Sequence, residues 1–247
     1  MDLKIVGRHA LVCGASRGLG FACAEALAAN GVRVTLVARD ITDLGTAAKR
    51  IRARTGARAE IIGADLSTEA GRDAVLQVCQ APDILVTNAG GPPSGDFRKL
   101  SREHWIEALD ANFINPVEMI RRTIDGMIER EFGRVVNITS MTVRVPVVDL
   151  DLSTATRLAL TGYVAGVARR VARSNVTINN LLPGTIATER VKQLGDMARR
   201  LIDTVPAGRA GTPAEFGEAC AFLCGASSGF ITGQNLLVDG GLCSLTI

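Results

Sequence analysis

The stretch Gly14-Ala15-Ser16-Arg17-Gly18-Leu19-Gly20 decides the fold of this 247-residue chain. It follows the apolar run Ala10–Cys13, which has the pattern of a buried strand, and it opens a helical pattern over Gly18–Asn30. Glycines between a strand and a helix permit a tight turn close to a phosphate, and the helix N-terminus supplies N–H groups and the positive end of its dipole. The stretch therefore predicts a dinucleotide-binding turn; a tight turn without a ligand is the alternative.

Strand and helix patterns alternate through the rest of the chain. Further strands are expected at Arg33–Val37, Ala59–Gly63, Ile84–Thr87, Arg134–Ile138, Thr177–Leu181 and Leu236–Val238. Helices are expected at Ile41–Thr55, Thr68–Gln80, Ser101–Arg130, roughly Ser153–Ser174, and Pro213–Cys224. Because the strands are apolar on both faces and alternate with helices, they indicate a parallel sheet covered on both sides. The predicted fold class is α/β: a single Rossmann-type doubly wound parallel sheet of about seven strands, forming one domain over residues 1–247.

Composition limits the partners that the chain can bind. Hydrophobic residues make up 47% of the chain and the net charge is +3, which suits a large core but not a nucleic-acid surface. No apolar run reaches the roughly 18 residues of a membrane span, and the first residues lack the apolar segment of a signal peptide. The spacing of the six cysteines fits no zinc pattern, and Cys220 and Cys224 are expected to be buried. We therefore expect a cytoplasmic protein with no metal site and neither nucleic acid nor membrane as a partner.

Three long irregular stretches follow predicted strands. They are Gly90–Leu100, Thr142–Leu152 and Pro183–Ala210, the last with short helices expected around Glu189–Thr204. Loops after the carboxyl ends of strands are where an open α/β sheet binds its ligand. The substrate is therefore expected among these loops.

Several motifs, in order along the whole chain, resemble those of the short-chain dehydrogenase/reductase superfamily. They are the glycine stretch, Asp65-Leu66, Thr87-Asn88-Ala89-Gly90, Asn112, Asn137-Ile138-Thr139-Ser140, Pro183-Gly184-Thr185-Ile186-Ala187-Thr188, and Ile231-Thr232-Gly233-Gln234 with Val238-Asp239-Gly240-Gly241. Within the superfamily, Gly90-Gly91-Pro92-Pro93 and the pattern around Ser153 are most similar to β-ketoacyl carrier-protein reductases.

The resemblance implies a nicotinamide cofactor and a small carbonyl or alcohol substrate. The residues that it places against the cofactor are Gly14, Ser16, Arg17, Gly18, Leu19, Gly20, Arg39, Asp65, Leu66, Asn88, Ala89, Gly90, Arg157, Pro183, Gly184, Ile186 and Thr188. It also implies that Asn112 kinks its helix and holds a water molecule.

Two arginines favour NADP(H) over NAD(H). Arg17 lies in the glycine stretch, and Arg39 follows the second predicted strand, where NAD-specific members of the superfamily usually have an acid. Two guanidinium groups near a ribose 2′-phosphate would make charge-assisted hydrogen bonds. Asp40, one residue later, is interpreted as the cap of the next helix rather than as a ligand of the ribose.

The resemblance fails at the proton-transfer site. The superfamily has Tyr-x-x-x-Lys beginning 13 positions after its catalytic Ser; here Ser153 and Arg157 occupy those positions, counted from Ser140. The expected catalytic set is Asn112, Ser140, Ser153 and Arg157. Tyr163 is the only tyrosine and lies about 15 Å along the helix from Ser153, so it is expected to be a packed or dimer-facing aromatic.

The altered site leaves two hypotheses open. Asp149 or Asp151 could supply a displaced acid, although helix capping or solvation is preferred for both, and a catalytic role for His104 is disfavoured. The first hypothesis is an NADP(H)-dependent oxidoreductase with altered proton transfer; the alternative is a non-catalytic NADP(H)-binding protein. A homotetramer is expected in either case, with a dimer as the alternative, formed through the helices at Ser101–Arg130 and Ser153–Ser174.

Overall fold

A seven-stranded parallel sheet forms the centre of the computed structural model, which describes residues 2–193 and 195–244. The strand order is β3-β2-β1-β4-β5-β6-β7, as expected for a doubly wound fold. The strands are β1 (His9–Cys13), β2 (Arg33–Ala38), β3 (Ala59–Gly63), β4 (Ile84–Thr87), β5 (Gly133–Ile138), β6 (Val176–Pro183) and β7 (Asn235–Val238). Every neighbouring pair is parallel. The predicted fold class is therefore confirmed.

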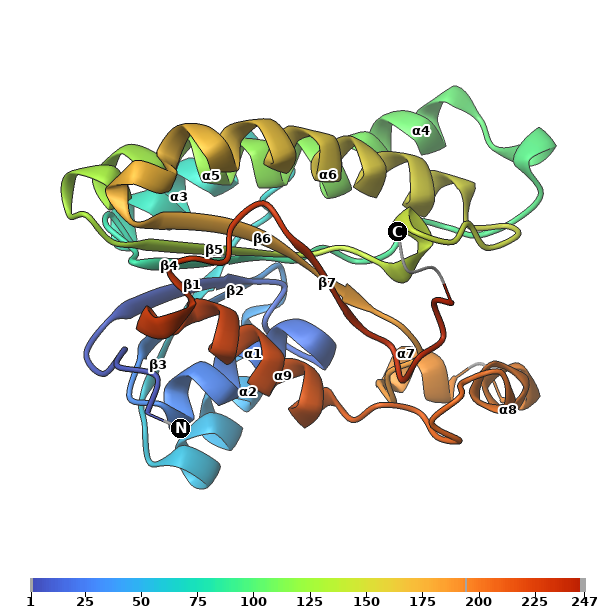
Figure 1. Cartoon of the computed structure of the whole chain (residues 1–247), viewed down its shortest axis with the longest axis horizontal. Helices are drawn as coiled ribbons and strands as arrows, with labels where there is room; N and C mark the ends of the chain where they lie inside the picture. Colours follow the sequence, from blue (N-terminus) through green and yellow to red (C-terminus); the bar gives the residue numbers. More distant parts are fainter. Residues whose placement is uncertain (1, 194, 245–247) are drawn as a thin grey trace.

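Helices cover both faces of this sheet (Figure 1). One face carries α1 (Gly18–Ala29), α2 (Ile41–Thr55) and α9 (Pro213–Cys224). The other carries α3 (Glu69–Val78), α4 (Arg102–Leu109), α5 (Asn115–Glu129) and α6 (Asp151–Val171). The short helices α7 (Glu189–Lys192) and α8 (Asp196–Asp203) follow β6, beyond the carboxyl end of the sheet. Each face of the sheet packs its own apolar cluster against these helices.

The predicted continuous helix over Ser101–Arg130 is wrong. A π-helical turn, Asp110–Ile114, separates α4 from α5. Pro116 explains the break, because it has no N–H to donate to the carbonyl four residues earlier and its ring would clash with that carbonyl. That carbonyl belongs to Asn112, which lies in the middle of the π turn and is buried. The π turn thus lies at the residue where the family resemblance implies a kink.

Two smaller predictions, one on helix capping and one on burial, are confirmed. The Asp40 carboxylate accepts hydrogen bonds from the backbone N–H groups of Thr42 and Asp43, so it caps α2. Cys220 and Cys224 are fully buried on α9. The helix predicted to begin at Ser153 begins two residues earlier, at Asp151, and a 3-10 turn over Ala172–Ser174 follows it.

A row of polar side chains crosses the sheet near its carboxyl edge, on the face covered by α6. Thr87, Asn137, Asn180 and Asn235 are register partners on β4, β5, β6 and β7. Each donates to the next, from Thr87 Oγ1 to Asn137 Oδ1 (2.6 Å), from Asn137 Nδ2 to Asn180 Oδ1 (3.1 Å) and from Asn180 Nδ2 to Asn235 Oδ1 (2.8 Å). A slip of one residue would break every bond, so this amide row fixes the register directly below the loops of the candidate site.

Candidate active site

The glycine loop is shaped by close backbone packing. Gly14 and Gly18 have φ of +58° and +62°, which residues other than glycine rarely adopt. A Cβ on Gly20 would lie 2.4 Å from the carbonyl oxygen of Gly14. The amide of Asn88, directly after β4, donates to that same oxygen over 3.2 Å. These contacts leave no room for a Cβ at Gly14 or Gly20, so the loop packs backbone against the end of β4 directly before α1.

The segment after β6 meets the glycine loop at the N-terminus of α1. Among the described residues no side chain caps the N-terminus of α1 at Arg17, which leaves its first N–H groups to an outside ligand. Thr188 follows β6, and its Cγ2 lies 3.9 Å from the position of a Cβ on Gly18. Gly184 packs so tightly that a Cβ there would lie 2.6 Å from the Cβ of Asp239. The structure thus brings the predicted Pro183–Thr188 segment to the predicted phosphate loop.

The residues expected at the other end of the cofactor share an edge of the sheet. Arg17 and Arg39 are both exposed. The pKa of Asp65 is lowered, first because its carboxylate accepts hydrogen bonds from the hydroxyl and backbone N–H of Ser67, and further because of the Arg39 charge. Leu66 is buried. Arg39 and Asp65 follow the paired ends of β2 and β3, where Ala38 lies opposite Gly63, at the edge where the resemblance places the adenosine ribose.

Arg157 joins the helix and the strand that carry the expected catalytic serines. Its side chain points from α6 to the end of β5 and is only 7% exposed. Nη1 donates to the carbonyl oxygen of Ile138 over 2.7 Å, and Nε donates to Oγ of Ser153 over 3.3 Å. Ser140 lies two residues beyond Ile138, and its Oγ accepts from the backbone N–H of Thr142 over 3.2 Å. One guanidinium thus holds both serine-bearing segments.

Asn112 presents a buried oxygen near this site. Its Nδ2 donates to the carbonyl of Ala108 over 3.1 Å, whereas its Oδ1 has no partner among the described residues. The π turn that contains Asn112 packs against α6. A buried oxygen of this kind is normally satisfied by ordered water or a ligand.

None of the alternative proton donors makes a hydrogen bond to Ser153 within the described residues. Asp149 and Asp151 are exposed. His104 Nδ1 accepts from the backbone N–H of Ser101, which makes it part of the capping box of α4. Tyr163 packs edge-on against Phe113 with ring centroids 6.5 Å apart, and burial raises the pKa of its phenol. These placements favour the structural interpretations of His104 and Tyr163.

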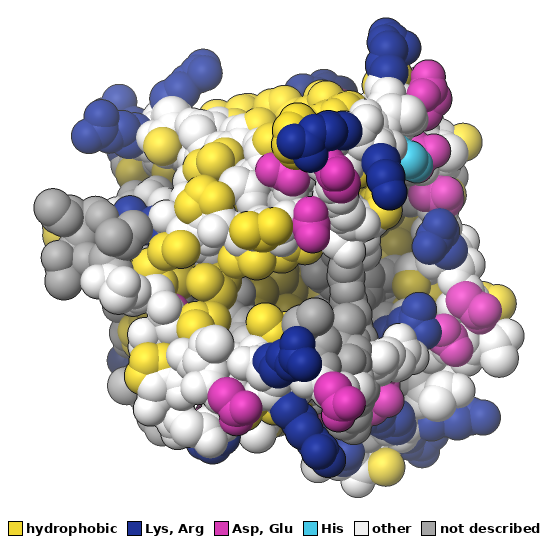
Figure 2. All heavy atoms as spheres, turned by 90° about the vertical axis from the view of Figure 1, so that its right-hand side faces the viewer, with side chains coloured by type: hydrophobic (Ala, Val, Ile, Leu, Met, Phe, Trp, Pro, Cys, Tyr) yellow, Lys and Arg dark blue, Asp and Glu magenta, His cyan; other side chains and the backbone are white. Residues whose placement is uncertain are grey.

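Hydrophobic side chains gather around a hollow at this end of the molecule (Figure 2). A cavity of about 380 Å³ lies on the outer side of α6, lined by Phe97, Trp105, Pro146, Val147, Asp151, Thr154, Ala155 and Leu158. The Gly90–Leu100 and Thr142–Leu152 loops meet beside it, where the backbone N–H of Gly95 donates to the carbonyl of Asp149 over 3.0 Å. Two of the three predicted ligand loops are therefore linked.

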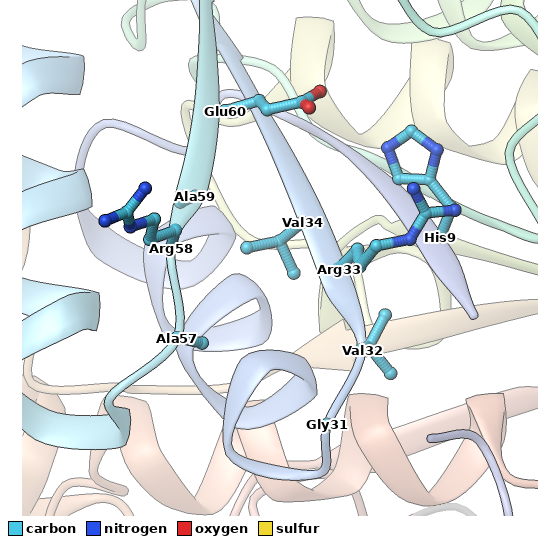
Figure 3. Close-up of a pocket in the computed structure, with 9 residues that line it drawn as sticks. All are labelled: His9, Gly31, Val32, Arg33, Val34, Ala57, Arg58, Ala59 and Glu60. Carbon is cyan, nitrogen blue, oxygen red and sulfur yellow. The ribbon is translucent and has the colours of Figure 1, made fainter. Parts of the chain in front are cut away.

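A second cavity, of about 560 Å³, lies at the opposite edge of the sheet (Figure 3). It surrounds the first residues of β1, β2 and β3, including His9, Arg33 and Glu60. Because ligands of open α/β sheets bind at the carboxyl ends of the strands, this cavity does not belong to the candidate site.

Sequence reasoning missed three contributors to the site. Pro116 was visible inside a predicted helix and signals the π turn. The polar residues within apolar strands, Asn137 and Asn180, signal the amide row. No sequence signal indicates that the Arg157 guanidinium reaches the carbonyl of Ile138.

The described ranges contain neither a cluster of metal-binding side chains nor a helix that could cross a membrane. Within residues 2–193 and 195–244, no group of three or more His, Cys, Asp or Glu side chains is placed to hold a metal ion. None of the helices in those ranges is long and apolar enough to cross a membrane.

Comparison with known proteins identifies the family. A family model described as enoyl-(acyl carrier protein) reductase matches residues 14–243. The 3-oxoacyl-[acyl-carrier-protein] reductase of Vibrio harveyi is 32% identical over 243 residues, covering 97% of this chain and 99% of the relative. The acetoacetyl-CoA reductase of Cupriavidus necator is 31% identical, covering 95% of this chain and 98% of the relative.

Solved structures agree with the sequence relatives. L-sorbose reductase from Gluconobacter frateurii, complexed with NADPH and L-sorbose, superposes with a TM-score of 0.93 at 27% identity, covering 99% of this chain and 100% of the other. A 3-oxoacyl (acyl-carrier-protein) reductase from Agrobacterium tumefaciens with NADP bound gives a TM-score of 0.90 at 30% identity, covering 97% and 95%. The chain belongs to the short-chain dehydrogenase/reductase superfamily of oxidoreductases, in its β-ketoacyl carrier-protein reductase-like branch.

Proposed function

We propose that this chain binds NADP(H), as one domain, and acts as an oxidoreductase on a small carbonyl or alcohol compound with an altered proton-transfer site. The observation that carries the proposal is the glycine loop, where Gly14 and Gly20 have no room for a Cβ beside Asn88 and the loop leads directly into α1. No side chain of the described residues caps the N-terminus of α1, so its positive dipole end would face a bound phosphate.

Arg17 and Arg39 support the choice of NADP(H). Both are exposed, and Arg39 lies at the edge of the sheet that carries Asp65. The NADPH-bound L-sorbose reductase and the NADP-bound 3-oxoacyl reductase share this fold over nearly the whole chain. A guanidinium is the side chain best suited to bind a 2′-phosphate bidentately.

The remaining site residues fit a nicotinamide placed between β5 and α6. When bound, NADPH supplies a hydride. In this proposal Arg157 would hold a ribose hydroxyl, and the hydroxyls of Ser140 and Ser153, which the bonds from Thr142 and Arg157 orient, would bind a substrate oxygen. The partnerless Oδ1 of Asn112 suits an ordered water molecule. Serine is a much weaker acid than tyrosine, and Arg157 stays protonated and cannot relay a proton.

Ser153 and Arg157, in place of tyrosine and lysine, also support the alternative, a non-catalytic NADP(H)-binding protein. Loss of a positioned general acid costs about 10²–10⁴-fold in rate. Nε and Nη1 of Arg157 donate hydrogen bonds to Ser153 Oγ and to the Ile138 carbonyl, as those of a structural residue would. Asp149 and Asp151 are exposed, and the described residues show no hydrogen bond from either carboxylate to Ser153.

We also propose that the chain assembles through α4, α5 and α6, as a homotetramer or a dimer. The outward side of α6 carries an exposed Leu158 and the exposed Gly162 and Gly166. A Cβ on either glycine would meet no atom within 4 Å, so this chain's own packing does not require them. Small residues on an exposed helix face permit the close approach of a second helix. A cytoplasmic location, without nucleic-acid or membrane partners, remains a prediction.

Calorimetry followed by turnover assays tests the proposal. NADPH and NADH are titrated into the full chain, and a panel of ketones, enones and alcohols is then assayed. Binding of NADPH in preference to NADH with measurable turnover supports the oxidoreductase. Binding without turnover on any compound supports the non-catalytic alternative, and no binding of either dinucleotide contradicts both.

A further inference from the structure

We propose that the cavity on the outer side of α6 binds a small apolar amine as its ammonium ion, with Asp151 as the charged partner and Trp105 and Phe97 as aromatic walls. The volume of this cavity, about 380 Å³, lies within the range of small-molecule sites. The inference goes beyond the proposed function and does not depend on it.

The cavity lies on a different side of α6 from the expected catalytic residues. Four of its lining residues recur every three or four positions along α6 and therefore form one side of the helix: Asp151, Thr154, Ala155 and Leu158. Arg157 points instead to the sheet, where it donates to the carbonyl of Ile138. Neither Ser153 nor Arg157 lines the cavity, so it is separate from the candidate active site.

The other walls are apolar and come from three segments. Phe97 lies in the 3-10 turn Phe97–Lys99, Trp105 lies on α4, and Pro146 and Val147 lie in the loop after β5. Phe97 and Val147 are exposed, as is Leu158 on α6. Exposed apolar side chains that gather around a hollow are typical of a binding surface rather than of a core.

Asp151 is the only charged residue among those that line the cavity. Within the described residues its carboxylate makes neither a hydrogen bond nor an ion pair, and no side chain caps the start of α6. Arg98 stacks on the ring of Phe97 with its guanidinium carbon 4.5 Å from the ring centroid, but it is paired with Asp96. The described part of the chain thus leaves the charge of Asp151 without a cation.

This combination of apolar walls and one carboxylate determines the class of ligand. A helix of a second copy would also cover apolar walls, but it would take the Asp151 carboxylate out of water without a compensating charge, which is costly. An ammonium group pairs with a carboxylate, and a cation is attracted to the face of an aromatic ring, most strongly to tryptophan. The glycines proposed for helix contact, Gly162 and Gly166, lie beyond the lining residues of α6.

Intrinsic fluorescence tests the site directly, because Trp105 is the only tryptophan of the chain. The probes are 2-phenylethylamine and 2-phenylethanol, which differ in carrying an ammonium or a hydroxyl group, and both are titrated into the full chain. We expect the amine to change the fluorescence and to bind about 3- to 5-fold more tightly than the alcohol, the effect of one partly exposed ion pair. Added salt should reduce this preference.

A matched pair of variants tests the role of the charge. Asp151→Asn removes the charge at constant size and should bind the two compounds with nearly equal affinity. The control Asp149→Asn removes another exposed carboxylate, two residues away and outside the cavity, and should keep the preference for the amine. Asparagine tolerates the left-handed backbone of Asp149, whose φ is +64°.

A third variant tests the location of the site. Ala155 is exposed, so the fold tolerates Ala155→Leu, which fills the cavity and should weaken the binding of both compounds. A preference for the amine that survives in Asp151→Asn would overturn the inference, as would equal binding of the two compounds by wild type.

The absence of any fluorescence change with either compound would also overturn it. If light scattering then shows wild type to be an oligomer, a second copy is the occupant of the cavity. Neither probe requires NADP(H), so these outcomes are independent of those that test the proposed function.

Discussion

The side-chain amide of Asn88 donates a hydrogen bond to the carbonyl oxygen of Gly14 over 3.2 Å and thereby ties the end of β4 to the glycine loop. A Cβ on Gly20 would lie 2.4 Å from this oxygen and 2.9 Å from the Asn88 amide nitrogen. The loop and the strand end therefore depend on one another for their shape, and a single methyl group would disturb both.

Gly20→Ala should lower both stability and NADPH affinity. Overpacking costs about 1–3 kcal/mol, and we expect a displaced loop to lose about ten-fold or more in affinity, since ten-fold corresponds to about 1.4 kcal/mol. The control is Gly45→Ala in α2, where a Cβ meets no atom within 4 Å. That change should stabilise the chain by about 0.5–1 kcal/mol. Urea unfolding and calorimetry check both variants. Unchanged NADPH binding by Gly20→Ala would show that the glycine loop does not bind the cofactor.

Arg39→Ala should weaken NADPH selectively. Loss of one charge-assisted hydrogen bond to the 2′-phosphate is worth about 1.5–3 kcal/mol, whereas NADH has no such phosphate. Arg58→Ala removes an equally exposed arginine at the opposite edge of the sheet and serves as the control. Titrations of both cofactors decide the matter, and equal affinities of the wild type for NADPH and NADH would rule out this role for Arg39.

Restoring the proton donor should increase ketone reduction. The double change Ser153→Tyr with Arg157→Lys returns a phenol beside a compact ammonium that lowers its pKa. We expect it to reduce β-ketoesters faster than wild type, and faster than Ser153→Tyr alone. The gain is limited because a phenol ring must fit beside buried neighbours such as Leu152 and Thr156. Steady-state rates with a β-ketoester test this. Wild-type turnover near 10 s⁻¹ would show that another group supplies the proton.

His9 should make stability depend on pH. Its Nε2 is hydrogen-bonded to Thr35 Oγ1 at 2.8 Å, and its pKa is lowered first by burial and then by the Arg33 charge, partly offset by Glu60 and Asp83. The folded state therefore prefers neutral His9. Its contribution is complete above the ordinary histidine pKa near 6.5 and is lost as the pH falls through the lower folded value.

The measurement is the urea midpoint at pH 7.5 and pH 5.5. We expect wild type to lose more stability over this interval than His9→Asn does. Equal losses by the two proteins would contradict the assignment of this pH dependence to His9.

Gly162→Leu should shift assembly toward the monomer. The glycine is exposed on α6 with no atom within 4 Å of a Cβ, so the fold of one chain tolerates a larger residue. A partner helix approaching this face would not. Light scattering should show an oligomer for wild type and smaller species for Gly162→Leu, while circular dichroism shows that the variant is folded. A 26.0 kDa particle for wild type at micromolar concentration would refute assembly.

Local patterns in the sequence were enough to predict the sheet, the glycine turn and the cap at Asp40. Buried parallel strands are continuously apolar, helices follow their own period, and both signals lie within a few neighbouring residues. The break at Asn112 was also local, through Pro116, but the helical pattern on both sides masked it. The replacement of Tyr and Lys by Ser153 and Arg157 was visible by counting from Ser140.

Only the tertiary structure decided which distant groups meet. Thr188 approaches Gly18, Arg157 reaches the carbonyl of Ile138, and Thr87 begins a row that ends at Asn235. These contacts depend on strand order and register, in which β4 lies between β1 and β5 although β2 and β3 precede it in the chain. Periodicity reports which face of an element is buried, but not which element covers it. The contacts of the site are therefore set by the packing of the whole sheet.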